Sequence, residues 1–356
     1  MRLTALLAVA GVAASMHAAA APSQVVLVRL VSPSWGFVVT STGSRTRLLA
    51  GDGQSWRDVT PPRVRFQPED LVFLDRQHGW LVTNDCAAAR ALVHRTSDGG
   101  RTWTAAHVRP TNCAAGSALS LSFVDRLHGW LVRTVENAPE AELARTVDGG
   151  RTWSRARELP QLGRVAFRTP RDGWLGRSDF RASPNLYVTA DGGLTWRPRT
   201  LPLPGGWRNA RALPDVPTFF GARGVLPVTL FTARRSGVAF YTTSDGGRTW
   251  RARSVRRVGF RTLLRSNPFP RYVPTAVASP TAWWVVSRIA VPRVLVTRDA
   301  GRHWSGSSPG GVSGAASARI AAAAGTAWLT LSTHRGRTQL VATRDAGRTW
   351  RRLRVP

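Results

Sequence analysis

The stretch Thr96-Ser97-Asp98-Gly99-Gly100-Arg101-Thr102-Trp103 decides the fold, because the same phrase returns to the end of the 356-residue chain. Six copies, which we call boxes, share the pattern Ser/Thr-x-Asp-x-Gly-x-Thr/His-Trp, with separations of 50, 43, 54, 54 and 46 residues. A seventh, degenerate copy lies at Leu49 to Trp56, with Gly51 in the place of the aspartate. A repeat of this length indicates an array of equivalent structural units. The box aspartates are Asp98, Asp148, Asp191, Asp245, Asp299 and Asp345.

A second phrase, Phe-x-Asp-x-x-x-Gly-Trp-Leu-Val, precedes the boxes and is nearly identical at Phe73–Val82 and Phe123–Val132. Short runs rich in β-branched and aromatic residues alternate with turn residues, and helical periodicity is absent beyond the N-terminal segment. Each unit therefore has four short antiparallel strands, with the box as the turn between the third and the fourth. In the third unit the predicted strands are 119–124, 129–134, 142–146 and 152–158.

Seven such units, at 43 to 54 residues each, predict an all-β, seven-bladed β-propeller with four-stranded antiparallel blades. An open β-solenoid is the less favoured alternative, because its coils are usually shorter and more uniform. The first unit begins at its innermost strand and the last ends at its outermost, so we expect blades one and seven to pack together without exchanging a strand. The propeller is expected to fill 21–356 as one domain, with blades at approximately 24–60, 61–110, 111–160, 161–205, 206–258, 259–310 and 311–356.

The residues of the box suit a tight turn. An aspartate side chain can accept hydrogen bonds from amides two or three residues further on, and glycine adopts a positive φ without steric strain. The closing tryptophan buries a large apolar surface, which contributes about 2 to 3 kcal/mol. The six box aspartates are therefore predicted to be structural.

The N-terminus predicts export from the cell. Met1-Arg2 precedes an apolar run from Leu3 to Ala14 and then the small residues Ala18 to Ala21, which together have the form of a secretory signal peptide. Residues 1–20 are the expected signal peptide, and an uncleaved membrane anchor is the alternative. A secreted or cell-envelope location follows, and nucleic acid is not an expected partner.

The formal net charge of +30 comes from 50 basic residues, all of them arginine, against 20 acidic ones. Codon bias can explain why arginine is used in place of lysine, but it does not explain the excess over acids. A charge of this size attracts anions. The expected partner is an acidic protein or an anionic cell-envelope polymer, a peripheral contact with a membrane is an alternative, and the protein is expected to be a monomer.

The longest insertions, Leu201 to Asp215 and Ser254 to Val273, fall on the face opposite the boxes, and the stretch 246–298 holds eleven arginines and no acid. Long loops on a rigid scaffold often carry binding sites, and guanidinium groups grip carboxylates and phosphates. The alternative is a solvated surface on which arginine stems cover apolar strands. The predicted ligand-binding residues are Trp207, Arg208, Arg211, Arg256, Arg257, Arg261, Arg265, Arg271 and Tyr272.

Cys86 and Cys113 are the only cysteines, and each falls in a loop on the face opposite the boxes. In an exported protein this placement predicts a disulfide between them, with two free thiols as the alternative. His78 and His128 occupy equivalent repeat positions, which favours a role in a turn over metal binding. No metal site and no cofactor are expected.

The boxes resemble the Asp-boxes, or bacterial neuraminidase repeats, of sialidases, sortilin-type receptors and some glycoside hydrolases. Over 24–356 the two phrases together are most similar to the photosystem II assembly and stability factor family. That resemblance implies a seven-bladed, non-enzymatic propeller that helps to assemble a membrane complex. The photosynthetic role itself does not follow, because one fold serves many functions.

The same resemblance raises a hydrolase as an alternative, but no catalytic residue is assigned. A sialidase-like site needs a tyrosine nucleophile, and of the three tyrosines Tyr187 and Tyr241 precede boxes on third strands, which leaves Tyr272. Carboxylates that could converge at the centre of the propeller are Asp70, Asp179 and Asp215. A carbohydrate-binding propeller, with exposed Trp207 and Tyr272 as stacking platforms, is a further alternative.

Overall fold

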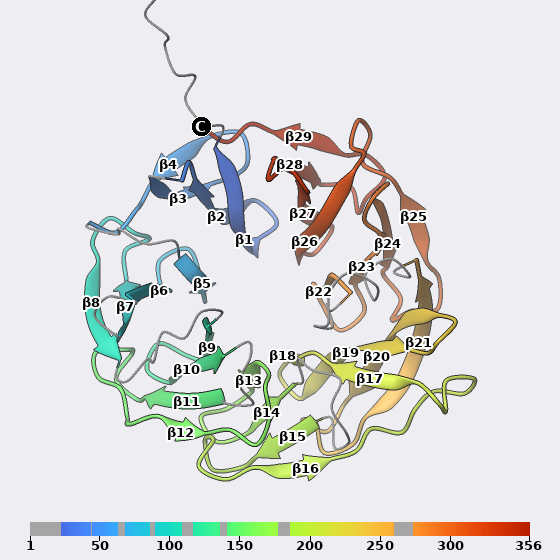
Figure 1. Cartoon of the computed structure of the whole chain (residues 1–356), viewed down its shortest axis with the longest axis horizontal. Coiled ribbons are helices and arrows are strands. Elements are labelled where there is room, and N and C mark those ends of the chain that lie inside the picture. The colour runs from blue at the N-terminus through green and yellow to red at the C-terminus, as the bar shows by residue number, and fades with distance from the viewer. Residues whose placement is uncertain are drawn as a thin grey trace, which may run out of the picture.

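The computed structural model describes residues 23–43, 45–62, 68–85, 90–108, 117–135, 141–176, 186–259 and 273–356. These residues form seven antiparallel sheets that are arranged in a ring around one axis, in chain order (Figure 1). The predicted all-β, seven-bladed propeller is therefore confirmed. Within the described ranges the structure contains no helix with the length and apolar character that crossing a membrane requires.

Each sheet is one blade, and its strands follow each other in sequence. Blades one to three consist of β1 (Gln24–Ser32), β2 (Trp35–Ser41), β3 (Thr46–Gly51) and β4 (Trp56–Asp58); β5 (Pro68–Phe73), β6 (Gly79–Asp85), β7 (Arg90–Thr96) and β8 (Thr104–Val108); and β9 (Ser117–Phe123), β10 (Gly129–Val135), β11 (Ala141–Thr146) and β12 (Arg157–Glu158). Blade four consists of β13 (Val165–Phe167), β14 (Gly173–Leu175), β15 (Leu186–Thr189) and β16 (Arg197–Arg199).

The remaining three blades complete the ring. They consist of β17 (Arg211–Pro214), β18 (Thr218–Phe220), β19 (Arg223–Phe231), β20 (Ser236–Thr243) and β21 (Arg251–Val258); β22 (Thr275–Val277), β23 (Trp283–Arg288), β24 (Arg293–Thr297) and β25 (Ser305–Ser307); and β26 (Ala315–Ala323), β27 (Thr326–Thr333), β28 (Thr338–Thr343) and β29 (Arg351–Leu353).

The first strand of blade five is split into β17 and β18, which both pair with β19. The break lies opposite Pro227, which pairs with Phe240 on its other side. Proline has no N–H to donate, so the ladder toward the first strand loses a bond there. The amide of Asp215 still reaches the Pro227 carbonyl at 3.0 Å, which keeps the two halves in line.

The predicted fourth strand of the third unit, 152–158, is shorter in the structure. Only Arg157 and Glu158 pair with β11. The reason is that Thr152 still belongs to the box turn, where it bonds to Asp148. The other three strands of that unit lie where the sequence pattern placed them, to within two residues.

The box of blade three shows how the turn is built. The Asp148 carboxylate accepts hydrogen bonds from the Thr146 and Thr152 hydroxyls at 2.8 and 2.6 Å, and from the amides of Arg151 and Thr152, each at 2.9 Å. The amide bonds therefore come from three and four residues further on, not from two and three as expected. The Thr146 hydroxyl in turn accepts the amide of Gly150 at 2.8 Å, which closes the turn.

Blade one carries the degenerate box, in which Asp52 replaces the missing aspartate one residue later. Its carboxylate accepts the amides of Gln54 and Ser55, each at 2.8 Å. The aspartate thus stabilises the turn from a position one residue later than in the other boxes, and the amides that it accepts come from two and three residues further on. The sequence pattern alone, in which Gly51 stands at the position of the aspartate, did not show that Asp52 takes over its role.

The glycine of the second phrase has a steric cause. A Cβ on Gly79 would lie 2.2 Å from the ring of Phe73, and a Cβ on Gly129 would lie 2.3 Å from the ring of Phe123. The phenylalanine of the first strand therefore lies across the start of the second strand of its own blade. In the turn between these strands, Asp75 accepts the amide of His78 at 2.7 Å and contacts its Nδ1 at 2.9 Å, so the predicted turn role of this histidine is confirmed.

Aromatic rings join neighbouring blades. Trp80 of β6 stacks on Phe123 of the next blade at a centroid distance of 3.8 Å, and Trp153 of that blade's box meets the Phe123 ring edge-on at 6.2 Å. Trp80 also donates its indole N–H to the carbonyl of Gly149, in the same box, at 2.8 Å. The box of blade three thus holds its own hairpin together and also the seam to the preceding blade.

The ring closes between blades one and seven, which lie side by side at the two ends of the colour scale (Figure 1). No strand is exchanged, as predicted: β1–β4 and β26–β29 form separate sheets. Trp328 is buried, meets Trp56 edge-on at 5.5 Å, and packs with Val28 and Leu353. The Trp56 indole N–H donates to the carbonyl of Arg354 at 2.9 Å.

We expect Asp148→Ala to lower the free energy of unfolding by about 1 to 2 kcal/mol, because it removes four hydrogen bonds to a largely solvated carboxylate. Glu158→Ala is the control, since Glu158 is exposed on β12. Urea unfolding followed by tryptophan fluorescence measures both. Equal stability of the two variants would contradict the structural role of the box.

The box aspartates also predict acid sensitivity. Partial burial raises the pKa of Asp148 and Asp191, but hydrogen bonds from threonine hydroxyls and backbone amides outweigh it and lower the pKa from 3.8 to about 2. A lowered folded-state pKa stabilises the fold above the unfolded value, and this stabilisation is lost as the pH falls from about 4 to about 2. The melting temperature should fall across this window, and less steeply in Asp148→Asn.

Trp328→Ala should open the closing seam and cost about 3 to 5 kcal/mol of stability. The control is Trp130→Ala, which removes an equally buried tryptophan where chain continuity keeps blades three and four together. Hydrogen exchange should rise specifically in β1 and β29 of the first variant. An increase spread evenly over all blades would show that the closing seam is not special.

Candidate binding site

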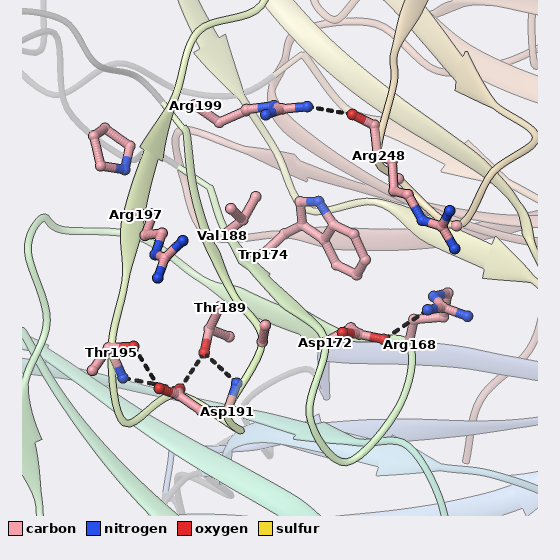
Figure 2. Close-up of a pocket in the computed structure, with 14 residues that line it drawn as sticks. Arg168, Asp172, Trp174, Val188, Thr189, Asp191, Thr195, Arg197, Arg199 and Arg248 are labelled. Atoms are coloured by element: carbon pink, nitrogen blue, oxygen red, sulfur yellow. Dashed lines mark hydrogen bonds and ion pairs between the residues drawn. The ribbon is translucent and has the colours of Figure 1, made fainter.

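A groove of 790 Å³ lies between blades four and five, on the side of the boxes. Its floor is formed by Trp174 of β14 and Val188 of β15, and its sides by the box of blade four and the Gly246–Arg248 part of the next box. Figure 2 shows guanidinium groups arranged around this floor. They belong to Arg168, Arg197, Arg199 and Arg248.

The charges in the groove do not balance. Arg168 pairs with Asp172 at 2.7 Å, and the Asp191 carboxylate is occupied by its own box turn. In the part of the chain that the structure describes, the other three arginines have no carboxylate within ion-pair distance. Arg199 instead donates to the backbone carbonyl of Arg248 (Figure 2). The groove therefore presents a net positive surface.

The rings at the seam under this groove are less closely stacked than those at the preceding seam, between blades three and four. The rings of Trp174 and Phe219 lie 4.5 Å apart and are inclined by 37°, whereas Trp130 and Phe167 lie 3.4 Å apart and are inclined by 2°. Trp130 donates its indole N–H to the carbonyl of Gly192 in the next box. The buried indole N–H of Trp174 has no such partner among the described residues, so the hydrogen bond that joins the two blades at the preceding seam is missing here.

Alternating residues of β16 explain why the groove is basic. Arg197 and Arg199 both line it, and the strand is the exposed outer edge of its blade. Charged residues on an edge strand also prevent pairing with other chains, and β21 is likewise rich in exposed arginine. Charge on an outer strand is therefore not a site by itself. The groove differs because its arginines surround a cavity.

The arginines predicted from the long insertions lie in blade five, away from this groove. Arg208, Arg211 and Arg257 are exposed, whereas Arg256 is half-buried with its guanidinium 5.1 Å from the Trp304 ring. Arg211 on β17 and Arg257 on β21 lie at the same end of the blade but on its inner and outer edges. Two intervening strands separate these edges by about 14 Å.

The prediction of an exposed Trp207 is wrong. Only 6% of Trp207 is exposed, because its ring packs on the backbone of Gly237 and Arg235 covers it at 4.3 Å. It cannot be a stacking platform for a sugar. The other predicted residues, Arg261, Arg265, Arg271 and Tyr272, lie outside the described residues, and so do Cys86, Cys113 and the expected signal peptide.

Five charged residues from the first strands or the segments beside them lie near the axis, and they had not been predicted to form one group. Asp70, Arg164, Asp215 and Arg319 lie at one register level in blades two, four, five and seven. Arg29 pairs with Asp70 at 2.8 Å, and Arg164 with Asp215 at 3.4 Å. Among the described residues, Arg319 has no acidic partner within ion-pair distance.

The environment of Arg319 shows that this group is close together. Desolvation by the surrounding protein atoms lowers the pKa of Arg319. The positive charges of Arg29 and Arg164 lower this pKa further, while the negative charge of Asp70 raises it. The repeat does contain a pattern from which part of this group could have been predicted. Asp70 and Arg164 each lie ten residues before a second-strand tryptophan, so aligning the units would have found them.

This group bears on the hydrolase alternative. Asp70 and Asp215, two of its three candidate carboxylates, are both held by arginines, and Asp179 lies outside the described residues. Tyr241 is fully buried, donates to the carbonyl of Pro202 at 2.6 Å, and has a pKa that burial raises to about 12. Tyr187 and Tyr241 lie on third strands, as predicted.

The solved structures that are similar to this one include three that differ in kind. The structure described as YCF48 bound to D1 peptide is 20% identical, with a TM-score of 0.48 over 81% of this chain and 80% of that one. A GH74 xyloglucanase from Xanthomonas campestris is 17% identical to this chain, with a TM-score of 0.58. The match covers 93% of this chain and 54% of the enzyme. Protein lmo1340 from Listeria monocytogenes EGD-e is 8% identical, with a TM-score of 0.58 over 93% of this chain and 94% of that one.

A search of the curated proteins gave no match. The family model of the Photosynthesis system II assembly factor YCF48, PSII_BNR, matches residues 112–289, which is half of the chain. This range contains the boxes of blades three to five and both sides of the basic groove. The chain therefore belongs to the photosystem II assembly factor YCF48 family of neuraminidase-repeat propellers.

Proposed function

We propose that this protein is an extracytoplasmic binding scaffold that holds an acidic segment of a partner protein in the groove between blades four and five. The observation that carries the proposal is the set of three arginines without carboxylate partners, Arg197, Arg199 and Arg248, around one cavity. Guanidinium groups bind carboxylates through two parallel hydrogen bonds, and a partly enclosed groove strengthens such bonds.

A protein partner is favoured over a polymer because the family is described as an assembly factor. The shape of the groove also supports a chain-like ligand. It is open along the seam and bordered by arginines from two blades, so successive acidic side chains of one segment could each meet a different guanidinium (Figure 2).

The location outside the cytoplasm rests on residues 1–20, whose sequence has the form of a signal peptide. The net charge of +30 supports the acidic nature of the partner, because long-range attraction raises the rate at which oppositely charged molecules meet. The arginines of the opposite face, including Arg208, Arg211 and Arg257, are a second basic surface against which the groove must be compared.

The test is the triple change of Arg197, Arg199 and Arg248 to Ser, assayed for binding to polyglutamate over a series of salt concentrations. The expected result is binding at least about tenfold weaker than wild type, since 1.4 kcal/mol corresponds to a factor of ten. The remaining binding should also depend less steeply on salt.

The matched control changes Arg208, Arg211 and Arg257 to Ser, which removes the same charge from exposed positions elsewhere on blade five. This control should bind nearly as the wild type does. Equal losses in both triple variants would mean that polyglutamate responds only to net charge. A larger loss in the control would move the site to the opposite face.

A further inference from the structure

Exposed apolar side chains gather on the box side of blades three and four. Leu127, Val147 and Leu194 are 50%, 56% and 53% exposed, and among the described residues only Val291 is a comparably exposed large apolar side chain. Leu127 lies in the turn before β10, and its carbonyl accepts the amide of Gly149 in the box that contains Val147. Exposed apolar groups that lie on adjoining turns indicate a contact surface.

Leu194 also breaks the repeat. It occupies the position before the box threonine or histidine, where the other five boxes all carry arginine. Val147 is likewise the only large apolar residue at its box position. The turn itself does not need the change, because the hydrogen bonds of Asp191 are the same as those of Asp148. The five arginines are Arg101, Arg151, Arg248, Arg302 and Arg348.

Val147 and Leu194 both line a groove of 420 Å³ at the seam between blades three and four. Leu143 and Trp153 add to its apolar lining, and Arg145 and Arg157 supply positive charge. Among the described residues that line this groove there is no carboxylate. The groove therefore combines an apolar surface with positive charge.

We infer that this groove is the docking site for an apolar side chain within an acidic segment of the partner protein. The inference rests on the proposed function, because it concerns the same segment. The box of blade four lies between the two grooves: Leu194 lines the apolar one, while Asp191 and Thr195 line the basic one. A segment laid across this single hairpin places its apolar side chain in one groove and its carboxylates in the other.

The experiment compares two synthetic acidic peptides, one with a leucine among glutamates and one with serine in the place of that leucine. Fluorescence anisotropy measures their binding to the full chain. The wild type should bind the leucine peptide about tenfold more tightly than the serine peptide, because burial of the leucine contributes only in the first case.

Leu194→Arg should remove this preference, and it restores the residue that the other boxes carry, so the turn should fold normally. Val291→Arg is the control, since it makes the same kind of change and adds the same charge at an exposed site in the turn between β23 and β24. The control should keep the tenfold preference. Comparing the two peptides on each variant cancels the effect of added charge.

The possible outcomes separate the two proposals. If both peptides bind the wild type equally and the Arg197, Arg199 and Arg248 triple variant weakens both, the basic groove is supported and the apolar docking site is overturned. If neither peptide binds, both proposals fail. A preference that survives Leu194→Arg would also overturn the docking site, because the apolar side chain would then bind elsewhere.

Discussion

The contact on which the ring rests is the contact between aromatic side chains of neighbouring blades, which occurs at every seam, either stacked, tilted or edge-on. The described blades share no hydrogen-bonded ladder with each other, so side chains must hold the ring together. At three successive seams a second-strand ring, such as Trp80, lies flat on a phenylalanine of the next blade, and that blade's box tryptophan meets the phenylalanine edge-on. These arrangements are favoured by the quadrupole of the rings and bury large apolar surfaces.

The other repeated residues serve this stack. The box aspartate stabilises its turn through side-chain hydrogen bonds, and the turn in turn sets the position of the box tryptophan. The glycine of the second phrase leaves room for the phenylalanine ring, as the 2.2 Å approach at Gly79 shows. A box amide also bonds to the turn between the first two strands, for example Gly99 to the carbonyl of Gln77 at 2.9 Å. One unit is thus a set of mutually dependent contacts, which explains why its residues recur together.

Two of the seams carry a groove on the side of the boxes. At the seam between blades four and five the stack is inclined and its tryptophan N–H has no partner among the described residues, and the basic groove lies there. At the preceding seam the stack is regular, but the box residue Leu194 replaces arginine and the groove becomes apolar. Turn and edge residues can therefore vary the chemistry of a groove without disturbing the aromatic core. The loop face, where the sequence analysis placed the binding residues, is not the face with these grooves.

The number of blades, the position of each box and the way the ring closes could all be predicted from the sequence, because they follow from short-range contacts that repeat along the chain. The structure was needed to show which residues meet across blades. Trp207 lies in a segment rich in proline and glycine and was expected to be exposed, yet it packs on Gly237, thirty residues away. Arg29 and Asp70 belong to different blades and pair near the axis. The grooves likewise combine residues of neighbouring blades, and such combinations depend on strand register and seam geometry, which no single repeat encodes.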